Sequence, residues 1–316
     1  MAVHDITTPA AGSSTSLRRG RRHRGERVIE AFLVVAALVS IATTVGIIVA
    51  LLQPTLRFFQ EVSLVEFFTS TSWTPTFADK HYGVLPLVVA TILTTLIAIA
   101  VAIPLGVGAA IYLAEYASDR TRRAVKPVLE ILAGIPTVVY GFFALFALNP
   151  ILQKYWPGNE KPGFFNVMVA GIVMGIMIVP TIASLSEDAM SAVPRSLREG
   201  AYALASSKMQ VATRVVFPAA ISGIIASFVL GISRALGETM IVTIAAGLSS
   251  DKVIWNPIEA AATMTAYIAN VASGDIPVDS IDYTTVFAVG SLLFVMTFAL
   301  NVLSIRLVRK FREVYE

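Results

Sequence analysis

The sequence predicts an all-α polytopic membrane protein with six transmembrane helices. Hydrophobic residues make up 56% of the 316 residues and charged residues only 14%, against roughly 25% in soluble domains. So few charges cannot cover the surface of a soluble protein of this length. Six apolar stretches each reach the ~20 residues that a helix needs to cross a bilayer. The expected spans cover residues 30–52, 84–114, 128–149, 164–186, 219–248 and 282–308.

The first apolar stretch follows a basic arm over residues 1–29. We expect it to be a retained span, because a signal peptide has a shorter apolar region and a small-residue cleavage site. Residues 30–316 are then expected to form a single six-span domain. The arm is expected to set the topology or to contact anionic lipid, and not to bind nucleic acid.

Glycine and proline interrupt the second, third and fourth spans. Such residues mark kinks or close packing between helices, and a bundle that moves between two states would use either. They are Pro104, Gly106, Gly108, Gly134, Pro136, Gly171, Gly175 and Pro180. Glu115 and Glu130 lie near span ends, where we expect them to reach the interface and have no further role.

The basic residues predict that both termini are cytoplasmic, because Lys and Arg concentrate in cytoplasmic segments. Most of them fall in the arm, in the loops after the second and fourth spans, and in the tail: Arg18, Arg19, Arg21, Arg22, Arg24, Arg27, Arg120, Arg122, Arg123, Lys126, Arg195, Arg198, Lys208, Arg214, Arg306, Arg309, Lys310 and Arg312. Trp73, Trp156 and Trp255 lie in the opposite, outer loops near span ends, as in aromatic belts. The long outer loops could receive an extracytoplasmic partner or be solvated connectors.

Several classes of function are excluded by what the sequence lacks. The absence of cysteine excludes disulfides and cysteine-ligated zinc, and the three histidines are too scattered for a metal site. The chain contains no P-loop, serine hydrolase elbow, zinc protease motif or dinucleotide fingerprint. The sequence therefore predicts a transport protein, not an enzyme.

Arg234 and Glu238 are two charges near the middle of the fifth span, four residues apart, and we therefore expect them on one helix face. Arg before Glu is the less favourable order for such a pair, since it opposes the helix dipole. We therefore favour a pathway for an anion, with the guanidinium as its contact and Glu238 positioning or moderating it. The alternative is a buried salt bridge that fixes helix packing. Small residues around the pair predict close approach of another pore helix: Gly231, Ser233, Ala235 and Gly237.

The cytoplasmic loop at about residues 187–218 carries a short expected helix. Pro194 suits its first turn, and helix formers follow through Leu204. Gly200 and the neighbouring alanines give this helix a small-residue surface that a partner could approach closely. Pro218 marks the turn into the fifth span.

The spacing in this loop resembles the coupling-loop signature of ABC importer permeases: Glu-Ala-Ala, three residues, Gly, nine residues, Ile-x-Leu-Pro. Glu199-Gly200-Ala201 is followed after three residues by Ala205, and after nine more by Val215-Val216-Phe217-Pro218. Gly200 replaces the first Ala of the signature, and Ala205 replaces its Gly. Glycine at position 205 would permit a tight turn with positive φ, which alanine adopts at a cost.

Other segments resemble the PstC-type permease of bacterial phosphate ABC importers, from about residue 30 onward. They are GVLPLVVATILTT, AIPLGVGAAIYLAEYA, KPVLEILAGIPTVVYGFFAL and SRALGETMIVTIAAG. RALGET also occurs in the sister PstA-type permease. LAGIPTVVYG, and the Met240 that directly follows RALGET, favour the PstC type. The resemblance implies a type I ABC importer permease fold.

The resemblance also implies the partners: a sister permease of PstA type, a PstB-type ATPase dimer and an extracytoplasmic phosphate-binding protein. ATP and Mg would be bound by the ATPase, and no cofactor by this chain. Glu199, Gly200, Ala201, Ala205 and Pro218 would serve ATPase coupling. Arg234 and Glu238 would lie in the path of inorganic phosphate through the bacterial plasma membrane.

Three alternatives remain at this point. A permease for another oxyanion, sulfate or molybdate, would use the same arginine contact. An ion-coupled secondary transporter would use Arg234 and Glu238 as a proton relay. A structural or signalling scaffold would need neither residue for uptake.

Overall fold

The computed structural model describes residues 24–274, 277 and 280–310. It divides into two compact units, residues 1–50 and 51–316, and the boundary falls inside the first helix. The basic residues Arg18, Arg19, Arg21, Arg22 and Arg312 lie outside the described residues.

Helices account for the spans and much of the loops, with π-helical turns (η) inserted at three places. In chain order the elements are α1 (Arg24–Glu61), α2 (Leu64–Thr69), α3 (Leu85–Ile111), η1 (Tyr112–Tyr116), α4 (Asp119–Ala133), α5 (Thr137–Phe143), η2 (Ala144–Leu148), α6 (Asn149–Tyr155), α7 (Val167–Ser191), α8 (Arg195–Ala203), α9 (Lys208–Val211), η3 (Ala212–Val216), α10 (Phe217–Ala219), α11 (Ile221–Leu236), α12 (Met240–Ala245), α13 (Met264–Ala272) and α14 (Ile281–Lys310).

Four of the expected spans coincide with long apolar helices. These are α1, α3 with η1, α7 and α14, and each is long and apolar enough to cross a membrane. Two bent helix pairs supply the remaining candidates, so the described residues provide six spans if each pair counts as one. The prediction of an all-α, multi-span protein is confirmed.

The third expected span, residues 128–149, is not one straight helix, and it breaks at the Gly134 and Pro136 that indicated a kink or close packing. The chain bends by 87° between the helix that ends at Ala133 and the one that begins at Thr137. Gly134 caps the first helix, and Pro136 has the extended backbone of an N-cap. Because a proline also disfavours the helical conformation of the residue before it, the Gly-Ile-Pro sequence interrupts the span.

The fifth expected span, residues 219–248, is also broken. Its N-terminal side bends by 72° between the segment that ends at Ala219 and α11, next to Pro218. Its other side breaks after Leu236, where Gly237 caps α11 and the chain resumes as α12 at Met240.

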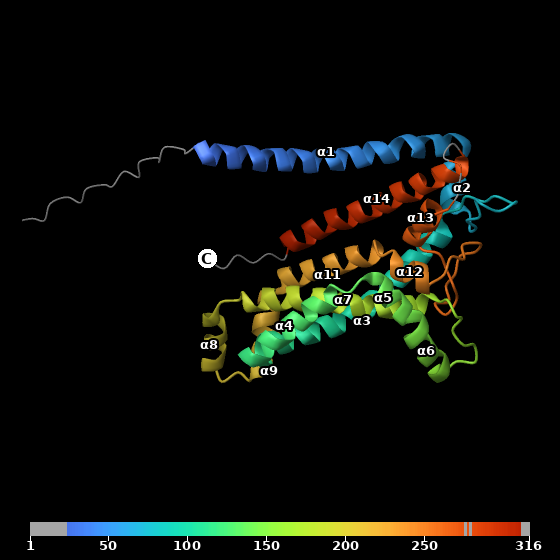
Figure 1. The fold of residues 1–316 in the computed structure, drawn as a ribbon. Coiled ribbons are helices and arrows are strands. Elements are labelled where there is room, and N and C mark those ends of the chain that lie inside the picture. The colour runs from blue at the N-terminus through green and yellow to red at the C-terminus, as the bar shows by residue number, and fades with distance from the viewer. Residues whose placement is uncertain (1–23, 275–276, 278–279, 311–316) are drawn as a thin grey trace, which may run out of the picture. The chain divides into compact units, whose positions relative to one another are not determined.

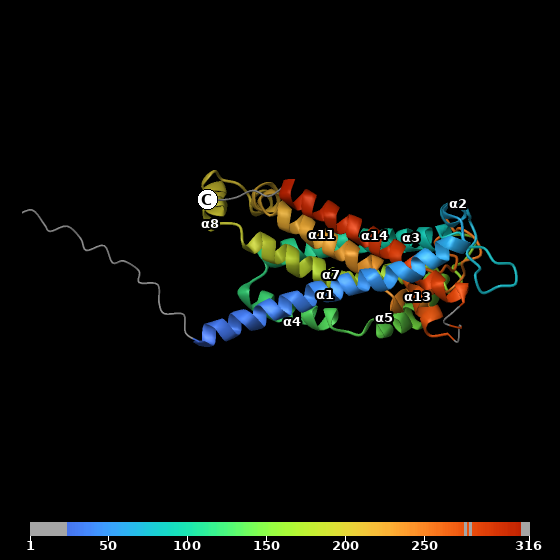
Figure 2. The same cartoon turned by 90° about the horizontal axis from the view of Figure 1, so that it is seen from above.

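The core of residues 51–316 is the contact between α3 and α7, which run alongside α11 and α14 (Figures 1 and 2). Glycines bring the α3 and α7 backbones together. A Cβ at Gly175 would lie 2.7 Å from the Ala98 carbonyl oxygen, and one at Gly171 would lie 2.7 Å from the Ile97 side chain. Gly231 of α11 faces α7 in the same way. The expected close approach of the fifth span to another helix therefore occurs within this chain.

Trp73 does not lie in a lipid-facing belt as expected. It is fully buried in an aromatic cluster at the outer-loop end of the bundle, where its ring packs edge-on against those of Phe67, Tyr82 and Tyr267. Nearby, Lys80 donates to Asp282 at 2.8 Å, and this hydrogen bond raises the pKa of Lys80. The pair fastens the first outer loop to the start of α14.

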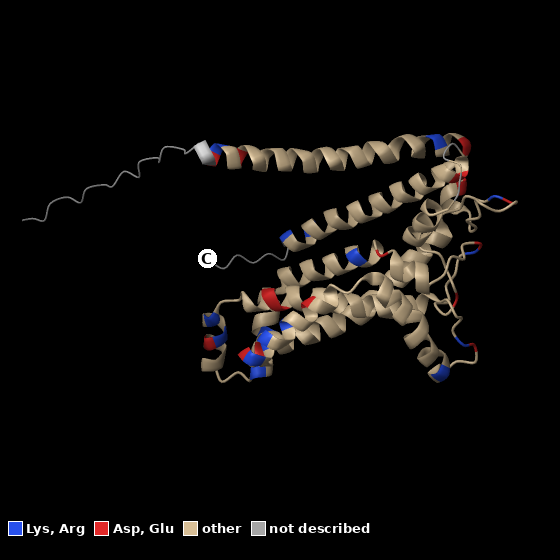
Figure 3. Cartoon of the chain, in the orientation of Figure 1, with Lys and Arg blue, Asp and Glu red and all other residues tan. Residues whose placement is uncertain are grey.

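Charged residues of the described part of 51–316 gather at the two ends of the bundle, and few lie between them (Figure 3). One end carries α8, α9, the start of α4 and the end of α14; the other carries the outer loops. This separation is the pattern from which the orientation was predicted.

Candidate functional site

Arg234 lies in the last turn of α11, at the end of the helix that precedes the break. Its side chain is half-buried, and its Nη1 donates to the Thr181 hydroxyl of α7 at 3.3 Å. A cation in the last turn of a helix is stabilised by the partial negative charge of the free carbonyl groups there. The position of Arg234 is therefore electrostatically favourable without a carboxylate partner.

Glu238 lies outside the helix, in the link between α11 and α12, and is 9% exposed. One oxygen of its carboxylate accepts hydrogen bonds from the backbone N–H groups of Met240 and Ile241, at 3.1 and 3.3 Å. Its backbone carbonyl accepts a 2.6 Å bond from the Thr265 hydroxyl. The carboxylate thus caps α12, at the end where a negative charge is favourable.

The expectation that Arg234 and Glu238 share one helix face is therefore wrong. The helix break separates them, and within the described residues neither is an ion-pair partner of the other. The dipole argument is reversed, since each charge lies at the helix end that stabilises it. Glu238 shapes the break that follows Arg234 and does not hold its guanidinium.

This arrangement leaves most of the Arg234 guanidinium available. Thr181 is its one hydrogen-bond partner among the described residues, and a guanidinium has five N–H donors. The free donors form a planar fork that suits the oxygens of a tetrahedral oxyanion.

The coupling loop folds as two short helices, α8 and α9, joined by a tight elbow. Glu199 and Gly200 are exposed on α8, and beyond the backbone of α8 itself no atom of the described residues would lie within 4 Å of a Cβ added to Gly200. Ala201 is half-buried and packs against an apolar cluster that includes Val211 and Val216. The small-residue surface is therefore open at Gly200 and turned partly inward at Ala201.

Ala205 forms the elbow with φ = 59°, a left-handed conformation in a residue other than glycine. The turn closes through bonds from the Ala205 N–H to the Tyr202 carbonyl and from the Ser206 N–H to the Ala201 carbonyl. Replacing glycine by alanine has therefore not removed the turn. The bent segment with Pro218 then leads into α11.

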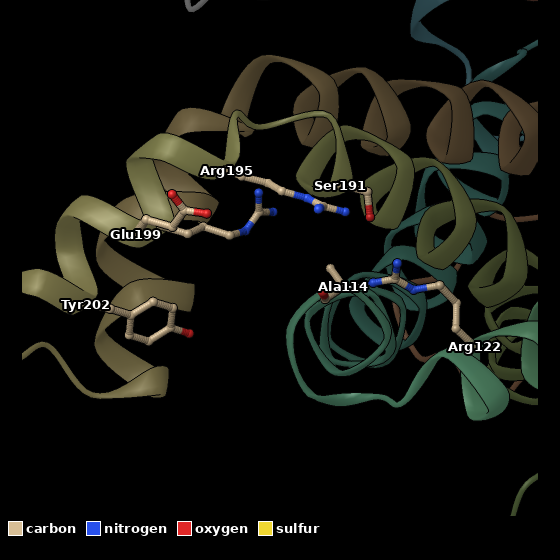
Figure 4. Close-up of a pocket in the computed structure, with 7 residues that line it drawn as sticks. Ala114, Arg122, Ser191, Arg195, Glu199 and Tyr202 are labelled. Atoms are coloured by element: carbon tan, nitrogen blue, oxygen red, sulfur yellow. Dashed lines mark hydrogen bonds between the residues drawn. The ribbon is translucent and has the colours of Figure 1, made fainter.

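A cleft of about 350 Å³ lies on the inner side of α8. Figure 4 shows Arg195 and Tyr202 extending from α8 toward Ala114, Arg122 and Ser191 across the opening. On α8 and the elbow, Leu204 is 84% exposed. The segment therefore offers both charged and apolar groups to a partner.

Sequence reasoning missed two groups at this end of the bundle. Glu115, expected at the interface, is instead buried and paired with Arg198 of α8. Glu187 of α7 is buried and paired with Lys126 of α4. These partners are far apart in sequence, so neither spacing nor hydropathy could have indicated the pairs; Glu130 is exposed, as expected.

The bundle combines broken spans, a short helix pair between α7 and α11, and a half-buried arginine within a span. A comparison with family models identifies the family: residues 102–313 match the binding-protein-dependent transport system inner membrane component. The chain belongs to this family. It is accordingly the permease subunit of an ABC transporter, whose ATPase is a separate subunit.

Relatives cover most of the chain. It is 36% identical over 303 residues to the probable ABC transporter permease protein YqgH of Bacillus subtilis, covering 96% of this chain and 95% of the relative. It is 35% identical to the phosphate transport system permease protein PstC of Xylella fastidiosa, covering 78% and 80%. With PstC 1 of Mycobacterium tuberculosis the identity is 34%, covering 78% and 82%.

Solved structures share the fold at low identity. A bacterial alginate ABC transporter chain is 15% identical and superimposes with a TM-score of 0.62, covering 94% of this chain and all of that one. A chain of the inward-facing MetNI methionine ABC transporter is 18% identical with a TM-score of 0.53, covering 73% and 95%. The type I importer permease fold predicted from the sequence is confirmed.

Proposed function

We propose that the chain is the permease subunit of an ATP-driven phosphate importer and that Arg234 contacts phosphate in the translocation pathway. The observation that carries the proposal is the half-buried guanidinium with a single side-chain partner, beside a break in a span. A charge within a span is costly and is kept where it faces a protein interior or a water-filled path.

The choice of phosphate rests on the relatives named as phosphate transport permeases. A guanidinium fork binds sulfate or molybdate nearly as well as phosphate, so the local chemistry alone leaves all three open. The helix break supports a pathway of some kind, because irregular backbone at membrane depth is tolerated where it is covered by protein or lines a water-filled cavity.

The proposed complex contains a sister permease of PstA type, two copies of a PstB-type ATPase and an extracytoplasmic phosphate-binding protein. The ATPase supplies ATP and Mg binding, and Glu199 through Ala205 dock on it. Exposed Glu199, Gly200 and Leu204 support this docking surface. Movement of the ATPase would then displace α8.

Stimulation of ATP hydrolysis by the reconstituted complex tests the substrate. Phosphate presented with the binding protein should stimulate hydrolysis, and the same concentrations of sulfate and molybdate should not. Stimulation by sulfate alone would overturn the choice of phosphate and leave an oxyanion permease. Uptake driven by a proton gradient without the ATPase would instead identify a secondary transporter.

A further inference from the structure

The guanidinium of Arg198 joins three elements at one end of the bundle. From α8 it donates to the Glu115 carboxylate of η1 through Nε and Nη2, both at 3.1 Å. Its Nη2 also donates to the Met190 carbonyl of α7 at 2.7 Å, and its Nη1 to the Val193 carbonyl at 2.5 Å. The side chains of Arg198 and Glu115 are only 17% and 5% exposed.

These contacts fix where α8 lies. The Met190 carbonyl belongs to the last turn of α7, where it also accepts a hydrogen bond from the Val193 N–H at 3.2 Å. The Glu115 side chain is almost fully buried, and a buried charge that loses its partner is strongly destabilised. Moving α8 away from η1 and α7 would therefore break several charge-assisted bonds at once.

A second buried group extends the same assembly to α4. Glu187 of α7 accepts hydrogen bonds from Lys126 Nζ at 2.7 Å and from the Ser191 hydroxyl at 2.8 Å. Arg122 of α4 lies 3.6 Å from that carboxylate and donates to the Leu113 and Ala114 carbonyls at 2.8 and 2.9 Å. The turn η1 is thus held by Arg198 through its side chain and by Arg122 through its backbone.

We propose that Arg198 and Glu115 are positioning residues that make α8, η1 and the end of α7 move as one body. Displacement of α8 then reaches α3 through η1, and reaches Arg234 through α7, which carries Thr181. The inference rests on the proposed coupling role of α8. It identifies the side chains that transmit this movement from α8 to the spans.

Spin labels test the rigid connection without reference to the substrate. The chain contains no cysteine, so cysteines introduced at the exposed positions Ser196 of α8 and Leu105 of α3 label uniquely in this subunit. In the full complex in lipid nanodiscs, the distance between the labels should be narrowly distributed and equal with and without ATP. Arg198→Gln should broaden the distribution of label distances. Arg123→Gln should not, since Arg123 is exposed and bonds within its own helix.

Coupling between ATP hydrolysis and uptake gives the second readout. Arg198→Gln and the milder Glu115→Gln should each raise the ATP hydrolysed per solute imported, on the order of tenfold, with the ATPase still bound. Arg198→Lys should retain part of the coupling. The control Glu130→Gln should match wild type, because Glu130 is exposed and has no partner among the described residues.

Two results would overturn the proposal: a label distance in the wild-type complex that changes with ATP, or wild-type coupling in both Arg198→Gln and Glu115→Gln. If Arg198→Gln does not assemble, Glu115→Gln still decides, because it keeps the size of the side chain. A wild-type complex that phosphate fails to stimulate would refute the proposed substrate only, since the label distances do not depend on it.

Discussion

The helix break between Arg234 and Glu238 changes the electrostatic environment of both charges. On a continuous helix their order opposes the dipole, but on either side of a break each lies at a stabilising helix end. Such placements are each worth roughly 0.3–1 kcal/mol. The two residues therefore have separable roles: Glu238 shapes the backbone, and Arg234 remains free for a solute.

Removing the charge of Arg234 tests its role directly. Arg234→Gln should abolish uptake while membrane insertion stays normal, because the guanidinium contact with the anion is lost. Solute uptake into proteoliposomes, with Arg57→Gln as an exposed control, is the measurement. Wild-type uptake by Arg234→Gln would remove this residue from the pathway.

The cap formed by Glu238 predicts a graded effect on stability. Glu238→Ala leaves two backbone N–H groups of α12 without their acceptor and should cost about 0.5–2 kcal/mol, as the loss of a helix cap does. Glu238→Gln keeps an acceptor oxygen and should cost less. Thermal unfolding in detergent measures the stability of the two variants. If Glu238→Ala and Glu238→Gln lose equal stability, the negative charge, and not the hydrogen-bonded cap, stabilises the segment.

Among the elements, the α8–α9 elbow carries backbone strain at Ala205. A left-handed conformation costs an L-residue roughly 1–2 kcal/mol, so Ala205→Gly should raise the free energy of unfolding of the loop. Gly200→Ala, in the open interior of α8, should also stabilise, by about 0.5–1 kcal/mol. Hydrogen exchange across residues 195–211 measures both, and loss of protection in Ala205→Gly would contradict the strained turn.

The α3–α7 contact predicts a contrast between two glycines. A Cβ at Gly175 would lie 2.7 Å from a backbone oxygen, whereas none of the described atoms lies within 4 Å of a Cβ at Gly108. Gly175→Ala should therefore cost about 1–3 kcal/mol, as overpacking does. Gly108→Ala should be tolerated, and equal melting temperatures for the two variants would show that α3 and α7 can separate without loss.

At the scale of the whole molecule, hydropathy predicted the helical class and four continuous spans, because span length depends only on bilayer thickness. The α8 helix followed from Pro194 and its run of helix formers, and the elbow from the spacing around Ala205. The break at Gly134–Pro136 lies where glycine and proline indicated a kink or close packing, whereas the break after Leu236 was missed, since apolar composition continues across it. The buried pairs of Glu115 and Glu187 depend on tertiary packing, which no local pattern reports.

The distribution of charge along the bundle predicts its orientation. Both termini should lie on the cytoplasmic side, because α4, the segment from α8 to η3 and the end of α14 together carry most of the described basic residues. A fluorescent protein fused to the C-terminus should fluoresce, and alkaline phosphatase fused there should be inactive. Phosphatase activity at that terminus would invert the assignment.

The interruption after Leu236 also bears on the fate of this subunit when it is made alone. Lipid cannot hydrogen-bond the guanidinium N–H groups of Arg234 that Thr181 leaves free beside the break, so the face that carries this side chain requires a protein neighbour or water beside it. A chain synthesised without its counterpart would offer that face to hydrocarbon. We therefore expect orphan copies to be short-lived and cleared by membrane quality-control proteases, and co-expression of the second permease to restore their abundance.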